Sequence, residues 1–104
     1  MNEVIDDLTL NRKGEQDEAI EVYRKALAID PDDVNTLCNC GFALKKIGEQ
    51  DEAIEMYRRA LAIDPGHVNT LRSYGIALDE KGEYDEAIEM YRRALAIDPD
   101  DVNT

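Results

Sequence analysis

Three near-identical copies of one short segment recur along the chain at a fixed spacing. Gly14–Glu21 reads GEQDEAIE, Gly48–Glu55 repeats it, and Gly82–Glu89 reads GEYDEAIE. The step from each copy to the next is 34 residues. A period of this size indicates a solenoid, in which each unit buries its apolar face against its neighbours. We expect residues 1–104 to form a single repeat domain with units of about 1–33, 34–67 and 68–101, followed by 102–104 as the start of a truncated unit.

The first half of each unit has the pattern of an amphipathic helix. In unit 34–67 the apolar or small residues recur at i, i+3, i+4 and i+7, at Leu37, Cys40, Gly41 and Leu44. An aspartate precedes this stretch as an N-cap, and Gly48 follows it as a stop, because glycine accepts the left-handed backbone. We refer to this first helix of a unit as helix A.

The second half of each unit predicts another helix, which we refer to as helix B. In unit 34–67 it covers residues 51–63, and Pro65 ends it. The linker between the helices is short, so they must pack antiparallel as a hairpin. Small residues recur where the helices come closest, which indicates a close contact; they are Gly41, Ala53 and Ala60, and then Gly75, Ala87 and Ala94.

This pattern resembles the tetratricopeptide repeat. The period, the Leu37…Gly41…Leu44 stripe, the Ala53…Tyr57…Ala60 stripe and the closing Pro65 are all similar to that family, from Gly14 onward. The resemblance implies an all-α fold: a right-handed α-solenoid of antiparallel helix pairs, with three helix-turn-helix units.

Both ends of the chain depart from the pattern. The positions of the first helix A that should be apolar are Glu3, Asp6, Asp7 and Leu10, of which only Leu10 fits, so this helix is expected to be atypical. No C-terminal capping helix follows the third unit. Its uncovered apolar edge is a candidate self-association surface, with Tyr91, Leu95 and Val102.

Sequence variation between the units gathers in helix A, whereas helix B is almost unchanged. By resemblance to the family, stacked A helices line a concave groove that binds peptides. The expected groove residues are Asn35, Cys38, Asn39, Phe42 and Lys45 from one unit and Asn69, Arg72, Ser73, Ile76 and Asp79 from the next. Drift at lightly constrained solvent positions explains the variation about equally well.

One family ligand can be tested against the sequence. The family's best understood groove is a carboxylate clamp for the C-terminal tails of heat-shock chaperones, built from lysine, arginine and asparagine. The matching positions here are Val4, Leu8, Asn39, Asn69 and Ser73, and only Asn39 fits. Because a clamp needs several cations on its carboxylates, we do not expect chaperone-tail binding.

Composition excludes several other functions. The net charge of −12 opposes non-specific binding of nucleic acid. Cys38 and Cys40 are two residues apart on a helix and face different ways, and His67 stands alone, so neither a disulfide nor a metal site is expected. The sequence shows no catalytic constellation, no cofactor motif, no membrane span and no signal peptide. We expect a cytoplasmic protein that is not an enzyme.

Two functional hypotheses remain. The first is a protein–protein interaction scaffold that binds a peptide or helix in the groove of the A helices. The alternative is a structural repeat fragment, natural or engineered, that forms homo-oligomers by stacking through its uncapped ends.

Overall fold

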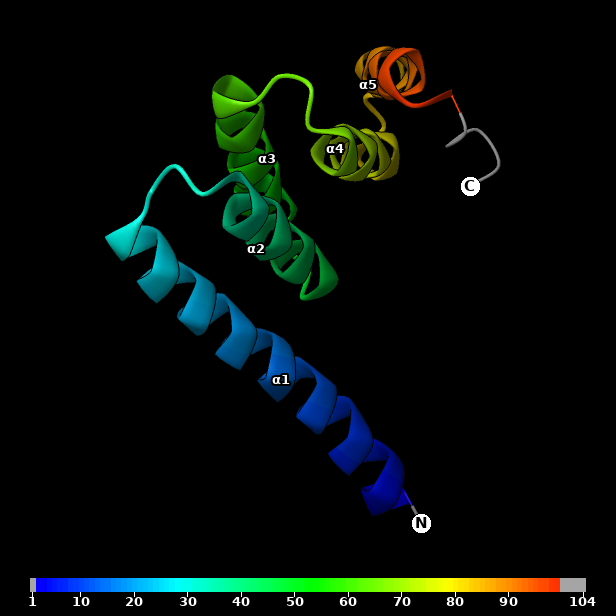
Figure 1. Cartoon of the computed structure of the whole chain (residues 1–104). Helices are drawn as coiled ribbons and strands as arrows, with labels where there is room; N and C mark the ends of the chain where they lie inside the picture. Colours follow the sequence, from blue (N-terminus) through cyan, green and yellow to red (C-terminus); the bar gives the residue numbers. More distant parts are fainter. Residues whose placement is uncertain (1, 100–104) are drawn as a thin grey trace.

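The chain folds into helices that are joined by short turns. The computed structural model describes residues 2–99, with side chains from residue 14 onward. This part of the chain holds five helices and no strand, which confirms the all-α prediction (Figure 1). They are α1 (Asn2–Ile29), α2 (Val34–Lys46), α3 (Gln50–Ile63), α4 (Val68–Lys81) and α5 (Tyr84–Ile97).

Helices α2 and α3 form one antiparallel hairpin, and α4 and α5 form the next. Asp33 caps the start of α2, where its side chain accepts a hydrogen bond from the Thr36 N–H at 3.3 Å. Gly48 takes a φ of +90° after α2, and Gly82 takes +91° after α4. The left-handed residue lets the Glu49 N–H donate to the Leu44 carbonyl at 2.9 Å, which closes the helix end. The predicted cap and stop are both confirmed.

Each hairpin closes on a glycine that faces a tyrosine ring. A Cβ added at Gly41 would lie 2.7 Å from Cε1 of Tyr57, and one added at Gly75 would lie 2.6 Å from Cε1 of Tyr91. Only glycine therefore allows this approach of the A and B helices. The predicted close contact is confirmed.

The two hairpins stack through α3 and α4 to extend the solenoid. The rings of Tyr57 and Tyr74 lie 6.2 Å apart between their centroids. The Tyr74 hydroxyl accepts from Nε of Arg58 at 3.0 Å and donates to Glu86 at 3.0 Å. Tyr57 is fully buried by this stacking, and its hydroxyl has no hydrogen-bond partner among the described residues.

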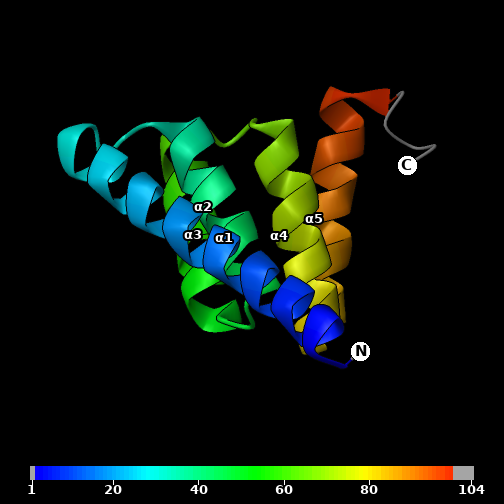
Figure 2. The same ribbon diagram turned by 90° about the horizontal axis from the view of Figure 1, so that it is seen from below.

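The first unit departs from the helix-turn-helix form, in keeping with the atypical first helix expected from the sequence. Helix α1 runs without a break from Asn2 to Ile29, so the first unit is one long helix and not a hairpin. Figure 1 shows the N-terminal half of α1 extending past α2 and standing clear of α4 and α5, and Figure 2 shows its straight course from below. The sequence around Gly14 is the same as that around Gly48, yet only Gly48 has a positive φ.

The residues before the two glycines account for this difference. Helix α2 packs against α3 through Leu37, Gly41 and Leu44, all of which are buried. The corresponding positions before Gly14 carry Glu3, Asp7 and Leu10. A hairpin at Gly14 would place carboxylates against an apolar face, which costs several kcal/mol for each buried charge. Continuing the helix avoids that cost.

Candidate peptide-binding groove

Helices α2 and α4 lie side by side and present one surface between them. A hollow of about 240 Å³ opens there, lined by Asn35, Cys38, Asn39, Phe42, His67, Asn69, Arg72 and Ser73. Seven of these eight residues were expected in the groove from the sequence, and His67 was not. The structure thus brings most of the predicted groove residues to one place.

His67 links the two helices at the closed end of this hollow. It is the N-cap of α4: its Nδ1 accepts from the Thr70 N–H at 3.3 Å and lies 2.7 Å from the Thr70 hydroxyl. Nε2 therefore carries the proton and donates to Oδ1 of Asn35 at 3.1 Å. The position of His67 matches that of Asp33, the N-cap of α2, and this match is the sequence signal that could have found it.

Two exposed apolar side chains lie on the A helices that form the groove. Phe42 on α2 is 47% exposed, and Ile76 on α4 is 43% exposed. The ammonium of Lys46 lies 4.8 Å from the Phe42 ring centroid, which is a cation–π contact. Both apolar residues correspond to one another in the repeat, so they are spaced by one repeat along the solenoid.

Three of the predicted groove residues do not line the hollow: Lys45, Ile76 and Asp79. The ammonium of Lys45 lies 3.3 Å from the Glu80 carboxylate on α4, and its side chain is only 17% exposed. Lys45 therefore ties α2 to α4 and has lost much of the freedom to reach a ligand.

The two cysteines are free and buried. Both belong to the core that α2 shares with its neighbours, and Cys38 also lines the hollow. Burial raises the pKa of the Cys40 thiol, with smaller contributions from nearby charges. A raised pKa keeps the thiol protonated, so Cys40 is a poor nucleophile.

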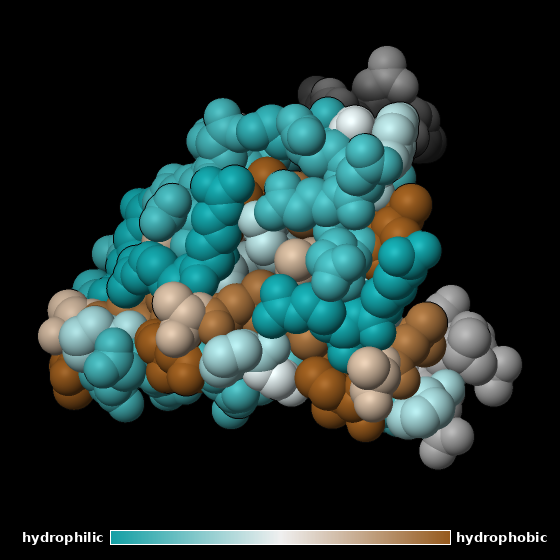
Figure 3. Space-filling model, turned by 90° about the horizontal axis from the view of Figure 1, so that it is seen from above, coloured by the Kyte–Doolittle hydropathy of each residue, from teal (hydrophilic) through white to brown (hydrophobic). Residues whose placement is uncertain are grey.

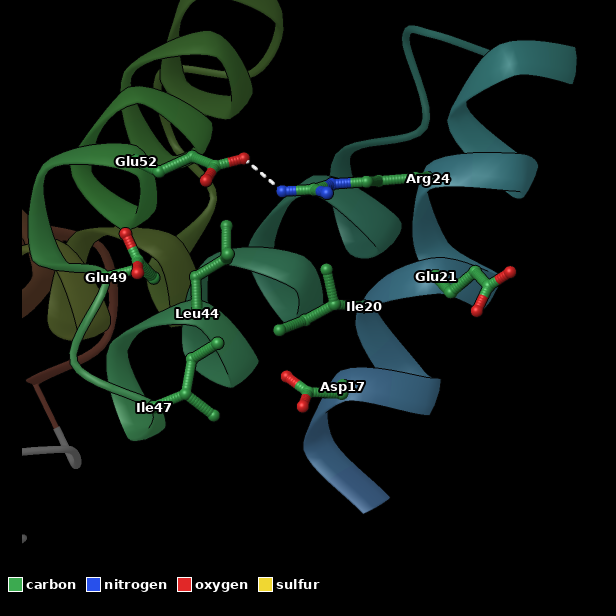
Figure 4. Close-up of a pocket in the computed structure, with 8 residues that line it drawn as sticks. All are labelled: Asp17, Ile20, Glu21, Arg24, Leu44, Ile47, Glu49 and Glu52. Carbon is green, nitrogen blue, oxygen red and sulfur yellow. Dashed lines mark hydrogen bonds and ion pairs between the residues drawn. The ribbon is translucent and has the colours of Figure 1, made fainter. Parts of the chain in front are cut away.

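A second hollow, which the sequence analysis did not find, lies between α1 and the α2–α3 hairpin. It measures about 500 Å³, and Figure 4 shows Ile20, Leu44 and Ile47 as its apolar floor. Charged residues surround this floor: Asp17, Glu21, Arg24, Glu49 and Glu52.

The next repeat carries larger or charged side chains at two corresponding positions. There Tyr74 bridges Arg58 and Glu86, and Lys81 binds Asp51 at 2.9 Å. The corresponding residues of the first site are the smaller Cys40 and the uncharged Ile47, and Arg24 pairs with Glu52 directly (Figure 4). Ile47, the counterpart of Lys81, lines the hollow, whereas Cys40, the counterpart of Tyr74, does not.

The predicted self-association edge lies on α5. Tyr91 and Leu95 are half-buried, while Tyr84 and Ile88 on the same helix are 62% and 47% exposed. Ile88 corresponds to Ile54 of α3, which is 4% exposed because α4 covers it. Val102 lies outside the described residues. The side chains of Val4 and Leu8, which match positions of the family's carboxylate clamp, also lie outside them.

Charge dominates much of the surface. Figure 3 shows one face that is mainly hydrophilic, with hydrophobic side chains gathered along one edge. Among the described residues, no three His, Cys, Asp or Glu side chains come together as a metal site. Within the same part of the chain, no helix combines the length and apolarity that crossing a membrane requires.

Comparison with family models identifies the repeat. A model described as TPR repeat matches residues 9–48, and a model described as tetratricopeptide repeat matches residues 48–103. The chain belongs to the tetratricopeptide repeat family. Comparison with curated proteins gives no match.

Solved structures of this family have the same fold. A crystal structure of MamA is 29% identical, with a TM-score of 0.77, and the match covers 86% of this chain and 53% of the MamA chain. This chain thus spans about half the length of that protein.

The first tetratricopeptide domain of Spaghetti (RPAP3), bound to the HSP90 peptide SRMEEVD, is 24% identical with a TM-score of 0.80, and 88% of this chain and 72% of that chain are covered. The second domain of Spaghetti, bound to the same peptide, is 23% identical with a TM-score of 0.78, and the match covers 86% and 83%. At these identities the two Spaghetti domains show the fold alone.

Proposed function

We propose that this chain is a protein-interaction scaffold, not an enzyme, and that it binds a peptide across α2 and α4. The observation that carries the proposal is the hollow between these helices, with Phe42 on its wall. Polar amides, a hydroxyl and an exposed ring surround one small space, which is the composition of a peptide site. The peptide-bound Spaghetti domains, which share the fold, support the interaction class.

The chemistry of the groove defines the ligand that suits it. Asn35, Asn39 and Asn69 each bring an amide donor to the hollow, while Oδ1 of Asn35 is paired with His67 and Oδ1 of Asn69 with Arg72. Such groups pair with the backbone of an extended peptide. Phe42 and Ile76 offer apolar contacts one repeat apart, so the ligand should carry an apolar side chain.

Charge argues against the chaperone tail that the Spaghetti domains bind. A ligand with two converging carboxylates needs several cations. Of the cations expected in the groove, only Arg72 lines the hollow, and Lys45 is engaged with Glu80. We propose a ligand of mixed charge with an apolar anchor.

Screening short synthetic peptides and then comparing two matched variants would test this proposal. Ile76→Ala and Ile63→Ala remove equally exposed isoleucines, 43% each, from α4 and from α3. We expect Phe42→Ala and Ile76→Ala to weaken a selected peptide about tenfold, because each removes an apolar contact of about 1–2 kcal/mol. Ile63→Ala should leave affinity unchanged. Equal effects of Ile76→Ala and Ile63→Ala would refute the groove assignment.

The alternative function, self-association through the α5 edge, is favoured by one observation. Ile54 and Ile88 are equivalent, yet α4 covers only Ile54. Light scattering over a wide concentration range would test it. If the edge drives assembly, the mass should rise with concentration and Tyr91→Glu should restore a monomer. A constant monomer mass would exclude this function.

A further inference from the structure

Helix α1 carries an apolar face that has no covering helix among the described residues. The face consists of Ala19, Val22, Tyr23 and Ala26, and we call it the α1 open face. Val22 is 61% exposed, and the other three residues are only half-buried. An open hollow of about 610 Å³ runs along it, bordered by Glu15 and Glu18.

The other two hairpins show what covers this face. The equivalent residues of α3 are Ala53, Met56, Tyr57 and Ala60, and α2 packs on them; those of α5 are Ala87, Met90, Tyr91 and Ala94, and α4 packs on them. Ala53, Tyr57 and Ala60 are fully buried as a result. In both hairpins the covering helix places a glycine on the tyrosine ring.

We propose that the α1 open face binds a helix from a partner protein, and that this helix carries leucine, glycine and leucine at i, i+4 and i+7. The glycine is required at Tyr23 for the reason seen at Tyr57, where a Cβ on Gly41 would come within 2.7 Å of the ring. The two leucines take the places that Leu37 and Leu44 take on α3.

Charge adds a further requirement for the partner helix. In an antiparallel hairpin the last turn of the A helix lies beside the first turn of the B helix. The first turn of the α1 open face is bordered by Glu15 and Glu18, so a partner helix with basic residues in its last turn is favoured. Helix α2 has this form, with Lys45 and Lys46 in its last turn.

A second copy of the chain does not supply such a helix. The leucine–glycine–leucine pattern occurs in α2 and α4, and Leu37, Leu44, Leu71 and Leu78 are all buried in their own hairpins. The sequence before Gly14 lacks the glycine and the first leucine of the pattern. No helix of this sequence is therefore free to be the occupant.

The test uses a synthetic peptide with the sequence of residues 34–47, in which Cys38→Ser and Cys40→Ser remove the thiols. The peptide is titrated into the ¹⁵N-labelled full chain and followed by NMR. We expect saturable shifts of the amides of Ala19, Val22, Tyr23 and Ala26. Because overpacking costs about 1–3 kcal/mol, the peptide with Gly41→Val should bind about tenfold more weakly or not at all. The peptide with the sequence of residues 68–81, whose last turn is more acidic, should also bind more weakly.

Two matched variants of the chain locate the binding. Val22→Lys alters an exposed residue of the α1 open face and should abolish the shifts. Ile88→Lys alters an exposed residue of α5 and should leave the shifts on α1 unchanged. The proposal is overturned by an absence of saturable shifts, by equal binding of the Gly41→Val peptide, or by binding that survives Val22→Lys. Light scattering of the chain without peptide tests for a dimer. A dimer that Val22→Lys abolishes would assign the α1 open face to a second copy instead.

Discussion

Replacing Gly14 by alanine and replacing Gly48 by alanine should change stability in opposite directions. The two glycines begin the same eight-residue sequence, GEQDEAIE. Gly14 lies inside α1 with a helical backbone, and a Cβ added there meets nothing within 4 Å. Alanine is favoured over glycine in a helix by about 1 kcal/mol. Gly14→Ala should therefore stabilise the chain by up to that amount.

Gly48→Ala should destabilise the chain, although the added Cβ also meets nothing within 4 Å. The cost comes from the backbone, because Gly48 has a φ of +90° and a left-handed conformation costs an alanine about 1–2 kcal/mol. The two variants should thus differ by about 2–3 kcal/mol in the free energy of unfolding. Gly82→Ala is the control, since its φ of +91° predicts the same loss as at Gly48.

Urea unfolding followed by circular dichroism at 222 nm measures these differences. A change of 1 kcal/mol corresponds to about 4–8 °C in Tm for a domain of this size, so thermal unfolding gives a second reading. The opposite signs follow from the unbroken course of α1. If the chain turned at Gly14 as it does at Gly48, both substitutions would destabilise, and that result would refute the single-helix description.

Three further predictions concern the buried residues Tyr57 and Cys40. Tyr57→Phe should be neutral or stabilising by about 1 kcal/mol, because the Tyr57 hydroxyl is buried without a partner; urea unfolding at neutral pH would check this, and a loss above 1 kcal/mol would contradict it. Burial also raises the pKa of Tyr57 above its ordinary 10.0. The stability that the neutral Tyr57 phenol contributes is therefore complete below pH 10.0 and is lost as the pH rises above it. The Phe variant should show a shallower loss of stability above pH 10 than the parent. Cys40→Tyr should reproduce the bridge that Tyr74 makes one repeat later and should raise the Tm by a few degrees in calorimetry; a lower Tm would show that the core around Cys40 does not admit the ring.

The hairpins could be predicted from the sequence because each signal acts locally. Gly48, Pro65 and the leucine stripe specify a stop, a boundary and a buried face within one unit. The groove residues followed from the period, because equivalent positions of successive A helices must lie on one face. Seven of the residues that line the hollow were found in this way.

The course of α1 could not be predicted from the turn sequence alone. GEQDEAIE is compatible with both a turn and a helix, and the choice depends on whether the preceding residues can pack on the following helix. The expectation at Gly14 relied on the repeat, while the decisive signal was the absence of apolar residues at Glu3, Asp6 and Asp7. His67 was missed for a related reason, since a histidine is an uncommon N-cap and its role appears only beside Thr70 and Asn35.

The three B helices have almost the same sequence and differ mainly in their neighbours. Helix α3 is covered on both apolar faces, by α2 and by α4. Helix α1 is covered where Ile20 and Leu27 are buried, and α5 where Ala87, Met90 and Ala94 are buried. Among the described residues, α1 and α5 thus each lack contact with one A-type helix, on opposite faces. A helix placed between α5 of one copy and α1 of another would contact both, as α4 contacts α3 and α5 within the chain. Two copies without such a helix would bring together faces that are not complementary, so we expect their association through the α5 edge to be weak.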